Sequence, residues 1–285
     1  MNKFVFITHV TPLAKRNKLR QRLFELYQTA LANQTYANWK VIQLHDGPDE
    51  QDDRFYRFHL PDASREIKNE TLKAIFQRED FNALMNESDY LIKLDDDDLI
   101  SPIILNTLSH FTGDLYYDHY HTFLDVSSGV VTQQKRAWIA STCVHKTQHA
   151  LAAWNGEGAS AIGNLLYTDH SKTWHRYYAD KNMQAAQPVH PVYARVLSPT
   201  SITSGGKGVV KTYADVDREK YVSYLRSFGD WKEAGTRDFN AVRKPLAQAW
   251  KEFSGEEQKP LPSKGVGALI ADRFRALKNK FGSNE

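Results

Sequence analysis

The sequence predicts an α/β protein in which a mixed, mainly parallel sheet is flanked by helices. Short apolar, strand-like runs alternate with segments of helical periodicity over the first third of the chain. Three of these runs end in polar residues, as expected where the carboxyl ends of parallel strands form a ligand-binding edge. The 285 residues are 41% hydrophobic and 25% charged, which is the composition of a globular protein with a substantial core.

The first elements follow in order along the chain. Strands are predicted for KFVFITHV (3–10), KVIQLHDG (40–47), RFYRFHL (54–60) and YLIKL (90–94). Helices are predicted for residues 17–33 and 67–81, where apolar side chains recur at helical spacing. Another helix is expected to begin at Pro102, because a missing N–H costs little in the first helical turn.

The later elements divide the chain into two parts. Residues 113–131 predict two strands joined by a turn at Ser127–Gly129, and further strands are expected in 136–145 and 187–197. A catalytic domain is predicted for 1–208. A helical C-terminal extension is predicted for 209–285, ending in the basic amphipathic helix 268–281.

The overall charge and the cysteine content exclude several classes of protein. A net charge of +3 is too small to indicate nucleic-acid binding. Cys143 is the one cysteine, so no internal disulfide forms, and a reducing compartment is consistent with this. The N-terminus lacks a signal-peptide core, and no apolar run is long enough to span a membrane. The sequence therefore predicts a cytoplasmic protein, soluble or bound to the inner face of the membrane.

Four adjacent carboxylates, Asp95, Asp96, Asp97 and Asp98, follow the strand YLIKL. They repel one another unless positive charge is nearby, and Mg²⁺ or Mn²⁺ would supply it while leaving coordination positions for a diphosphate. The alternative is an acidic helix start, in which a carboxylate caps the helix and interacts with its dipole. That alternative accounts for one or two aspartates, and we therefore favour a metal site.

Several segments, in the same order along the chain, resemble family 2 glycosyltransferases of the Rossmann-like GT-A fold. They are ALANQTYANWKVIQLHDG (30–47), YLIKLDDDDLISP (90–102) and YARVLSPTSITS (193–204), and the resemblance covers about residues 3–205. It implies that Asp46 holds the nucleobase or ribose and that Thr8 lies where the nucleotide pocket begins. Arg195 would bridge the acidic site and the phosphates.

Within the aspartate motif the resemblance implies separate roles. Asp95 would face the ribose and the metal, and Asp97 would bind the metal. Asp98 would support the site or contact the donor sugar. Asp96 occupies the variable position, and we expect it to be solvated and to matter least. His190 would complete the metal site, although a lone histidine is more often structural.

The general base is predicted at Asp169, in the segment YTDHSKTWHRYY. The Glu-Asp pair of the family is incomplete here, since Thr168 precedes Asp169, and the competing interpretation of Asp169 is a helix N-cap. Glu157 is the second candidate. The loop 201–208 either covers the diphosphate or is a plain surface turn.

Together these features predict a metal-dependent glycosyltransferase with Mn²⁺ or Mg²⁺ as cofactor. It would move a sugar from a nucleoside-diphosphate donor to a glycan or lipid-linked acceptor, with inversion implied by the resemblance, in bacterial surface-polysaccharide synthesis. The C-terminal helix would contact the membrane or dock on its own domain. A nucleotidyltransferase is one alternative, although THVTPLAKRNK lacks the glycines of its phosphate loop. A non-catalytic sugar-nucleotide or glycan-binding module is the other.

Overall fold

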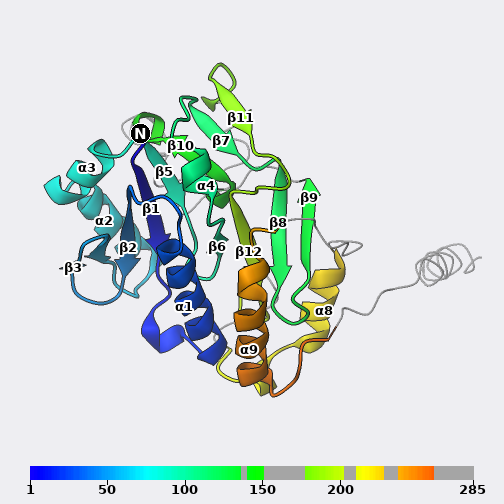
Figure 1. Ribbon diagram of the computed structural model, residues 1–285. Helices are drawn as coiled ribbons and strands as arrows, with labels where there is room; N and C mark the ends of the chain where they lie inside the picture. Colours follow the sequence, from blue (N-terminus) through cyan, green and yellow to red (C-terminus); the bar gives the residue numbers. More distant parts are fainter. Residues whose placement is uncertain (136–139, 151–176, 202–209, 228–236, 260–285) are drawn as a thin grey trace, which may run out of the picture.

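The computed structural model describes residues 1–135, 140–150, 177–201, 210–227 and 237–259. Within these ranges, eight strands form one large sheet (Figure 1). In spatial order they are β11 (Met183–Ala185), β7 (Leu115–Tyr117), β10 (Cys143–Lys146), β5 (Tyr90–Lys93), β1 (Phe4–His9), β2 (Trp39–His45), β4 (Phe55–His59) and β3 (Glu50–Gln51).

The centre of this sheet is parallel, as the sequence predicted. β5, β1, β2 and β4 run parallel to one another, whereas β10 is antiparallel to both β5 and β7. Ile7 on β1 lies opposite Lys93 on β5 and Ile42 on β2. The carboxyl ends of β1, β2 and β5 therefore meet at one edge. The prediction of a mixed, mainly parallel sheet is confirmed.

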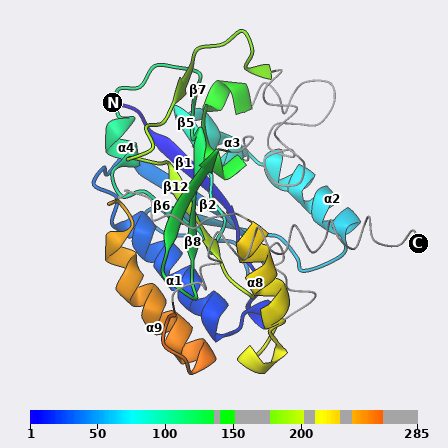
Figure 2. The ribbon, with the colours of Figure 1, turned by 90° about the vertical axis from the view of Figure 1, so that its right-hand side faces the viewer.

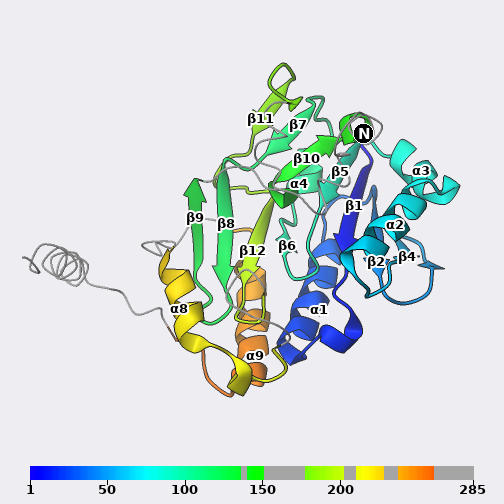
Figure 3. The ribbon, with the colours of Figure 1, turned by 180° about the vertical axis from the view of Figure 1, so that it is seen from behind.

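Helices cover both faces of the large sheet, because side chains alternate along its central strand. Val5 and Ile7 point into a core shared with α2 (Arg65–Phe76) and α3 (Glu79–Asn86). Phe4 and Phe6 point into the opposite core, shared with α1 (Lys18–Ala32) and the short helix α4 (Ile104–Thr107). Figure 2 shows α1 and α2 on opposite sides of the strands. Figure 3 views the molecule from behind and shows α2 and α3 beside each other.

Two predicted helices differ from the structure. The segment expected to form one helix over 67–81 forms two, α2 and α3, because Arg78 adopts an extended backbone conformation between them. The helix expected to begin at Pro102 is the single turn of α4, which begins two residues later, and an unpredicted two-residue strand, β6 (Leu99–Ile100), precedes it.

A second, smaller sheet contains β6, β12 (Tyr193–Leu197), β8 (Tyr120–Asp125) and β9 (Val131–Lys135), in that order. The predicted hairpin at Ser127–Gly129 is confirmed as the β8–β9 connection. Gly129 has φ +70° and donates its N–H to the Asp125 carbonyl over 2.8 Å. A glycine suits this turn because the left-handed region carries a steric penalty for other residues.

The helices of the extension pack on this smaller sheet from both sides. Tyr221 and Leu225 of α8 (Arg218–Ser227) contact one face, and α9 (Arg243–Ser254) covers the other (Figure 2). Leu246 and Trp250 of α9 share a core with Leu19 of α1. Short 3-10 turns complete the structure: η1 (Leu13–Lys15), η2 (Ala140–Thr142), η4 (Tyr213–Asp215) and η5 (Asn240–Val242).

The C-terminal helix predicted for 268–281 lies outside the described residues. Within the part of the chain that the structure describes, no helix combines the length and the apolar character needed to cross a lipid bilayer.

Candidate functional site

The four aspartates form a tight turn between β5 and β6, at the edge where β1 and β2 also end. The N–H of Asp98 donates to the carbonyl of Asp95 over 3.1 Å, which closes the turn. Leu94 before the turn and Leu99 after it are fully buried and anchor its two ends. Because the backbone reverses within four residues, the four carboxylates have different surroundings.

Asp96 is enclosed by the loop that follows β1. Its carboxylate accepts hydrogen bonds from the Thr11 N–H at 2.7 Å and from the Thr11 hydroxyl at 3.1 Å, and Arg20 Nη2 lies 3.2 Å away. Only 4% of Asp96 is exposed. The expectation that Asp96 is solvated was therefore wrong, because the loop after β1 folds over this side chain.

Asp97 forms an ion pair with Arg20, which lies in the first turn of α1. The same guanidinium donates to the Thr11 hydroxyl over 2.6 Å. Burial raises the pKa of Asp97 to about 6, the nearby charges of Asp96 and Asp95 add to this effect, and Arg20 opposes it. Asp97 therefore binds a proton more readily than an ordinary carboxylate, despite its contact with Arg20.

Asp98 points away from this loop and towards the smaller sheet. Its carboxylate accepts the N–H of Val196 on β12 at 2.9 Å, and 3% of the residue is exposed. Burial raises the pKa of Asp98 well above its ordinary value, and the charges of Asp97 and Asp95 raise it further. Asp98 thus connects the aspartate turn to β12, which also carries Arg195.

Asp95 is the most open of the four, with 41% of its side chain exposed. It forms an ion pair with Lys93, which lies two residues earlier on β5. Partial burial acts to raise the pKa of Asp95, but the charges of Lys93, Arg195 and Arg20 outweigh it and hold the pKa below its ordinary value. Asp95 therefore carries a negative charge at the open side of the turn.

Positive side chains surround the aspartates, which the sequence alone did not indicate. Arg20 and Lys93 form ion pairs with them, and Arg195 acts electrostatically on Asp95 and Asp98. The cluster therefore has positively charged partners within the chain, in addition to any metal that it binds. No local pattern identifies Arg20, because only the packing of α1 brings it to the turn after β5.

Of the residues at the ends of β1 and β2, one is buried in the core and the others lie at the edge of the sheet. Thr8, the predicted start of the nucleotide pocket, is fully buried, and its hydroxyl lies 2.8 Å from that of Tyr27 in the core. Thr11, three residues later, is the threonine that contacts the aspartate turn. Asp46 is exposed after β2. Arg16, in the loop after β1, lies within the electrostatic influence of both Asp46 after β2 and Asp96 after β5.

The structure does not bring His190 to the aspartates. Its Nδ1 lies 3.4 Å from Asp238 Oδ1, and Asp238 in turn accepts the Ser101 hydroxyl at 2.6 Å. Ser101 follows β6 at its far end, whereas Asp98 precedes β6. His190 is half exposed there, beside a carboxylate supplied by the C-terminal extension. Asp169 and Glu157, the two candidates for the base, lie outside the described residues, as does almost all of the loop 201–208.

The donor atoms at Asp95 and Asp97 suit a metal that a diphosphate helps to bind. Among the described residues, no group of three or more His, Cys, Asp or Glu side chains is placed to hold a metal ion. Mg²⁺ at phosphate sites needs only one or two carboxylates, because phosphate oxygens and water complete its shell. Asp95 Oδ2 and Asp97 Oδ1 have no hydrogen-bond partner within the described part of the chain. These two oxygens can therefore supply the one or two carboxylate ligands that Mg²⁺ needs beside a diphosphate.

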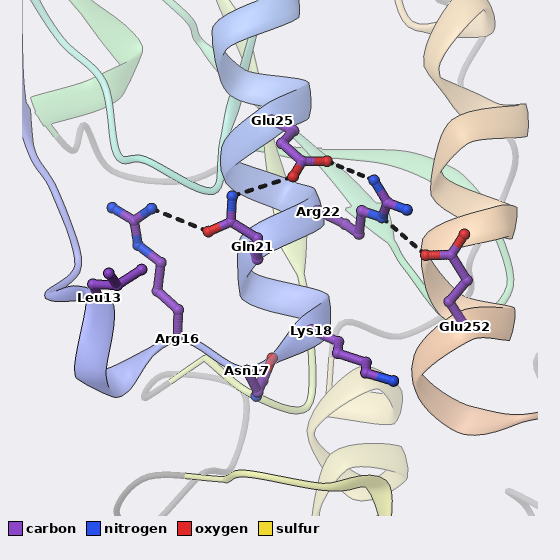
Figure 4. Close-up of a pocket in the computed structure, with 8 residues that line it drawn as sticks. All are labelled: Leu13, Arg16, Asn17, Lys18, Gln21, Arg22, Glu25 and Glu252. Atoms are coloured by element: carbon purple, nitrogen blue, oxygen red, sulfur yellow. Dashed lines mark hydrogen bonds and ion pairs between the residues drawn. The ribbon is translucent and has the colours of Figure 1, made fainter.

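A shallow groove of about 680 Å³ lies beside the site, along the outer face of α1 (Figure 4). Its lining includes Arg16 and Gln21 on one side and Arg22, Glu25 and Glu252 on the other. Arg22 there contacts both glutamates at 2.8 Å. None of the four aspartates lines this groove, and Arg16 is the residue that it shares with the candidate donor site.

Comparisons with known proteins give distant structural similarity only. No protein-family model and no curated protein matches the chain. Residues 1–349 of TarS from S. aureus are 12% identical, with 88% of this chain and 72% of that chain covered and a TM-score of 0.38. The glycosyltransferase GlyE from Streptococcus pneumoniae TIGR4 is 12% identical, with 93% and 66% covered and a TM-score of 0.37.

Coverage differs among the other similar structures. A putative nucleotide-diphospho-sugar transferase from Desulfovibrio desulfuricans G20 is 9% identical, with 87% and 99% covered and a TM-score of 0.32. A longer structure of S. aureus TarS is covered over 48% of its length, so this chain spans about half of it. Because identity and TM-score are low throughout, the proposals below rest on the chain's own residues.

Proposed function

We propose that this chain is a glycosyltransferase that uses a nucleoside-diphosphate sugar as donor. The observation that carries the proposal is the meeting of Asp46, Thr11 and the aspartate turn at the carboxyl ends of three neighbouring parallel strands. Ligands of open α/β sheets bind at this edge. The ordered resemblance to family 2 glycosyltransferases of the GT-A fold supports the same assignment.

The carboxyl edge of the large sheet carries both acidic and basic side chains. This mixture suits a donor that consists of an anionic diphosphate and a polar nucleoside. Asp46 and Asp95 are exposed or partly exposed carboxylates that can accept hydrogen bonds from a ribose or a nucleobase. Arg16, Lys93 and Arg195 supply positive charge for the diphosphate. Asp98 holds the turn against β12, and Asp96 holds it against the loop after β1.

We propose Asp95 and Asp97 as the residues that hold Mn²⁺ or Mg²⁺ together with the diphosphate. When bound, the ion would neutralise the charge that develops on the departing diphosphate. Asp97 suits this role because one of its carboxylate oxygens has no hydrogen-bond partner within the described residues. We do not assign His190 to the metal, because it pairs with Asp238 at the far end of β6.

Transfer also needs a base that takes the proton from the acceptor hydroxyl. We keep Asp169 in this role on the strength of the family resemblance, together with inversion at the anomeric carbon. The acceptor is proposed to be a growing glycan or a lipid-linked glycan in bacterial surface-polysaccharide synthesis. The basic segment 268–281 would then hold the enzyme at an anionic membrane surface.

A screen of donor turnover tests this function. The chain is incubated with UDP-, GDP- and dTDP-sugars and with Mn²⁺ or Mg²⁺, and release of the nucleoside diphosphate is measured. We expect one nucleotide class to be turned over slowly without acceptor and faster with the correct acceptor. Loss of that turnover in Asp169→Asn would support the base, and full retention would exclude it.

The screen also separates the alternatives. Release of pyrophosphate from a nucleoside triphosphate and a sugar 1-phosphate would indicate a nucleotidyltransferase instead. Binding of a sugar nucleotide without turnover, across all donors and a panel of glycan acceptors, would indicate a binding module on this fold.

A further inference from the structure

Arg20 occupies an unusual position in the candidate site. Its guanidinium bridges two of the four aspartates and the loop after β1, through Asp97, Asp96 and the Thr11 hydroxyl. The side chain is 16% exposed. The backbone N–H of Arg20 is itself fixed, since it donates to Asn17 at the N-cap of α1 over 2.8 Å. Helix capping therefore sets where this cation lies.

The contacts of Arg20 are not equivalent. Thr11 and Asp96 are bonded to each other as well as to Arg20, through the Thr11 N–H and hydroxyl. Asp97 has Arg20 as its only hydrogen-bond partner among the described residues, and that contact uses a single oxygen. Asp97 can therefore exchange its partner while Arg20 keeps two others.

We propose that Arg20 is a built-in competitor of the divalent cation: it neutralises Asp97 in the ligand-free chain and leaves that carboxylate when the ion arrives with the donor diphosphate. Arg20 then remains bonded to Asp96 and Thr11, so the loop after β1 stays attached to the aspartate turn. This inference rests on the proposed function, because it requires a metal that binds with a nucleotide.

The competition has a functional consequence. A cation that binds Asp97 alone must displace Arg20, whereas one that binds with a diphosphate gains the phosphate oxygens as well. The ligand-free site should therefore bind Mn²⁺ weakly, and nucleotide and metal should strengthen each other's binding, as linkage requires. Arg20 would in this way suppress occupation of the site by metal alone.

Arg20→Gln tests the proposal because it removes the charge and keeps a polar side chain. Two like charges in contact repel strongly even at an effective dielectric constant of about 20, so we expect Mn²⁺ without nucleotide to bind at least about tenfold tighter than in the wild type. Free Mn²⁺ would be followed by electron paramagnetic resonance at about pH 8, where Asp97 is ionised. Mn²⁺ affinity equal to or weaker than that of the wild type would overturn the proposal.

The chain offers two matched controls. Arg22→Gln removes the same charge from the same helix, but at the pairs with Glu25 and Glu252, shown in Figure 4. It should leave Mn²⁺ binding unchanged, and tightening equal to that of Arg20→Gln would show that net charge alone is responsible. Arg20→Lys keeps the charge and should retain weak, wild-type binding.

A measurement on the unaltered protein covers the case in which Arg20→Gln does not fold, since breaking a buried ion pair is strongly destabilising. The guanidinium NMR signal of Arg20, assigned with Arg20→Lys, should change on addition of Mg²⁺ with UDP, and that of Arg22 should not. An unchanged Arg20 signal at saturation would overturn this proposal and leave the proposed function intact. No binding of Mg²⁺ with any of UDP, GDP or dTDP would overturn both this proposal and the metal site of the proposed function.

Discussion

The N–H of Thr11 donates a hydrogen bond of 2.7 Å to the carboxylate of Asp96. This contact joins the loop after β1 to the turn after β5, two segments that are 85 residues apart in the chain. With the second bond from the Thr11 hydroxyl, it buries an aspartate that would otherwise face solvent. The bond therefore sets how the two ends of the candidate donor site lie relative to each other.

Thr11 and Thr8 should respond to mutation in opposite ways. Thr11→Val removes one bond to Asp96 and the acceptor for Arg20, so we expect UDP in the presence of Mn²⁺ to bind up to about tenfold more weakly, with little change in stability. Thr8→Val breaks the bond to Tyr27 in the core and should lower the free energy of unfolding by about 1 kcal/mol, with UDP binding unchanged.

Calorimetric titration and denaturant unfolding of both variants would check this pair of predictions. Weaker UDP binding in Thr8→Val, with normal binding in Thr11→Val, would show that Thr8 and not Thr11 lies at the nucleotide pocket.

Asp118 should make the stability of the protein depend on pH. Burial raises the pKa of this carboxyl well above its ordinary value, although both of its oxygens accept the N–H of Val192, at 2.9 and 3.0 Å. The folded chain then binds a proton more tightly than the unfolded chain does. This group's contribution to stability is complete below about pH 4 and is lost as the pH rises towards the folded pKa.

Asp118→Asn removes that titration and keeps one acceptor for Val192. Its free energy of unfolding, relative to the wild type, should therefore rise as the pH increases from about 4 towards the folded pKa of Asp118. Urea unfolding at several pH values would measure the difference. A difference that is constant over this range would show that Asp118 titrates in the same way in the folded and unfolded chains.

The contact between α1 and α9 should depend on apolar packing rather than on its ion pair. Leu246 is fully buried in the core shared with Leu19, so Leu246→Ala should cost about 2–5 kcal/mol. Glu252→Gln breaks an exposed pair with Arg22 and should leave the stability almost unchanged. Thermal unfolding followed by circular dichroism would compare them. A Leu246→Ala protein as stable as the wild type would show that the extension adds nothing to the stability of the rest.

Ligand binding should stabilise the aspartate turn. Mn²⁺ and UDP together should raise Tm by more than the sum of their separate effects, because each completes the site for the other. Differential scanning fluorimetry would measure these shifts in Tm. Asp180→Asn, which changes an exposed carboxylate paired with Lys181, should show the same shifts as the wild type. Purely additive shifts would argue against a shared site.

The sequence predicted the central strands well because their apolar runs are compact and end in polar residues. β1, β2, β5 and α1 lie where those runs and the helical periodicity placed them. β6 was missed because a pair of apolar residues is too short to show a period. The break between α2 and α3 carries neither glycine nor proline, so no local signal marks it.

The candidate site was predicted only in part, because tertiary packing brings some of its residues to the aspartates. Lys93 could have been found, since it lies near the end of the predicted strand, only two residues before Asp95. Arg20 could not, because a charged residue in the first turn of a helix normally faces solvent. Thr11 and Arg20 reach the aspartates only through tertiary packing, which sequence periodicity does not encode.

Turnover of nucleotide sugars by the wild type and by Asp97→Asn is the most direct test of the central claim that the aspartate turn is a donor site. Asn preserves the shape of the side chain but removes the charge that would hold the metal. With the donor identified by the screen and with Mn²⁺ present, we expect turnover to fall at least about a hundredfold in Asp97→Asn, as is typical when a group that stabilises developing charge is lost. Asp180→Asn should retain it. Equal turnover by Asp97→Asn and the wild type would contradict the account.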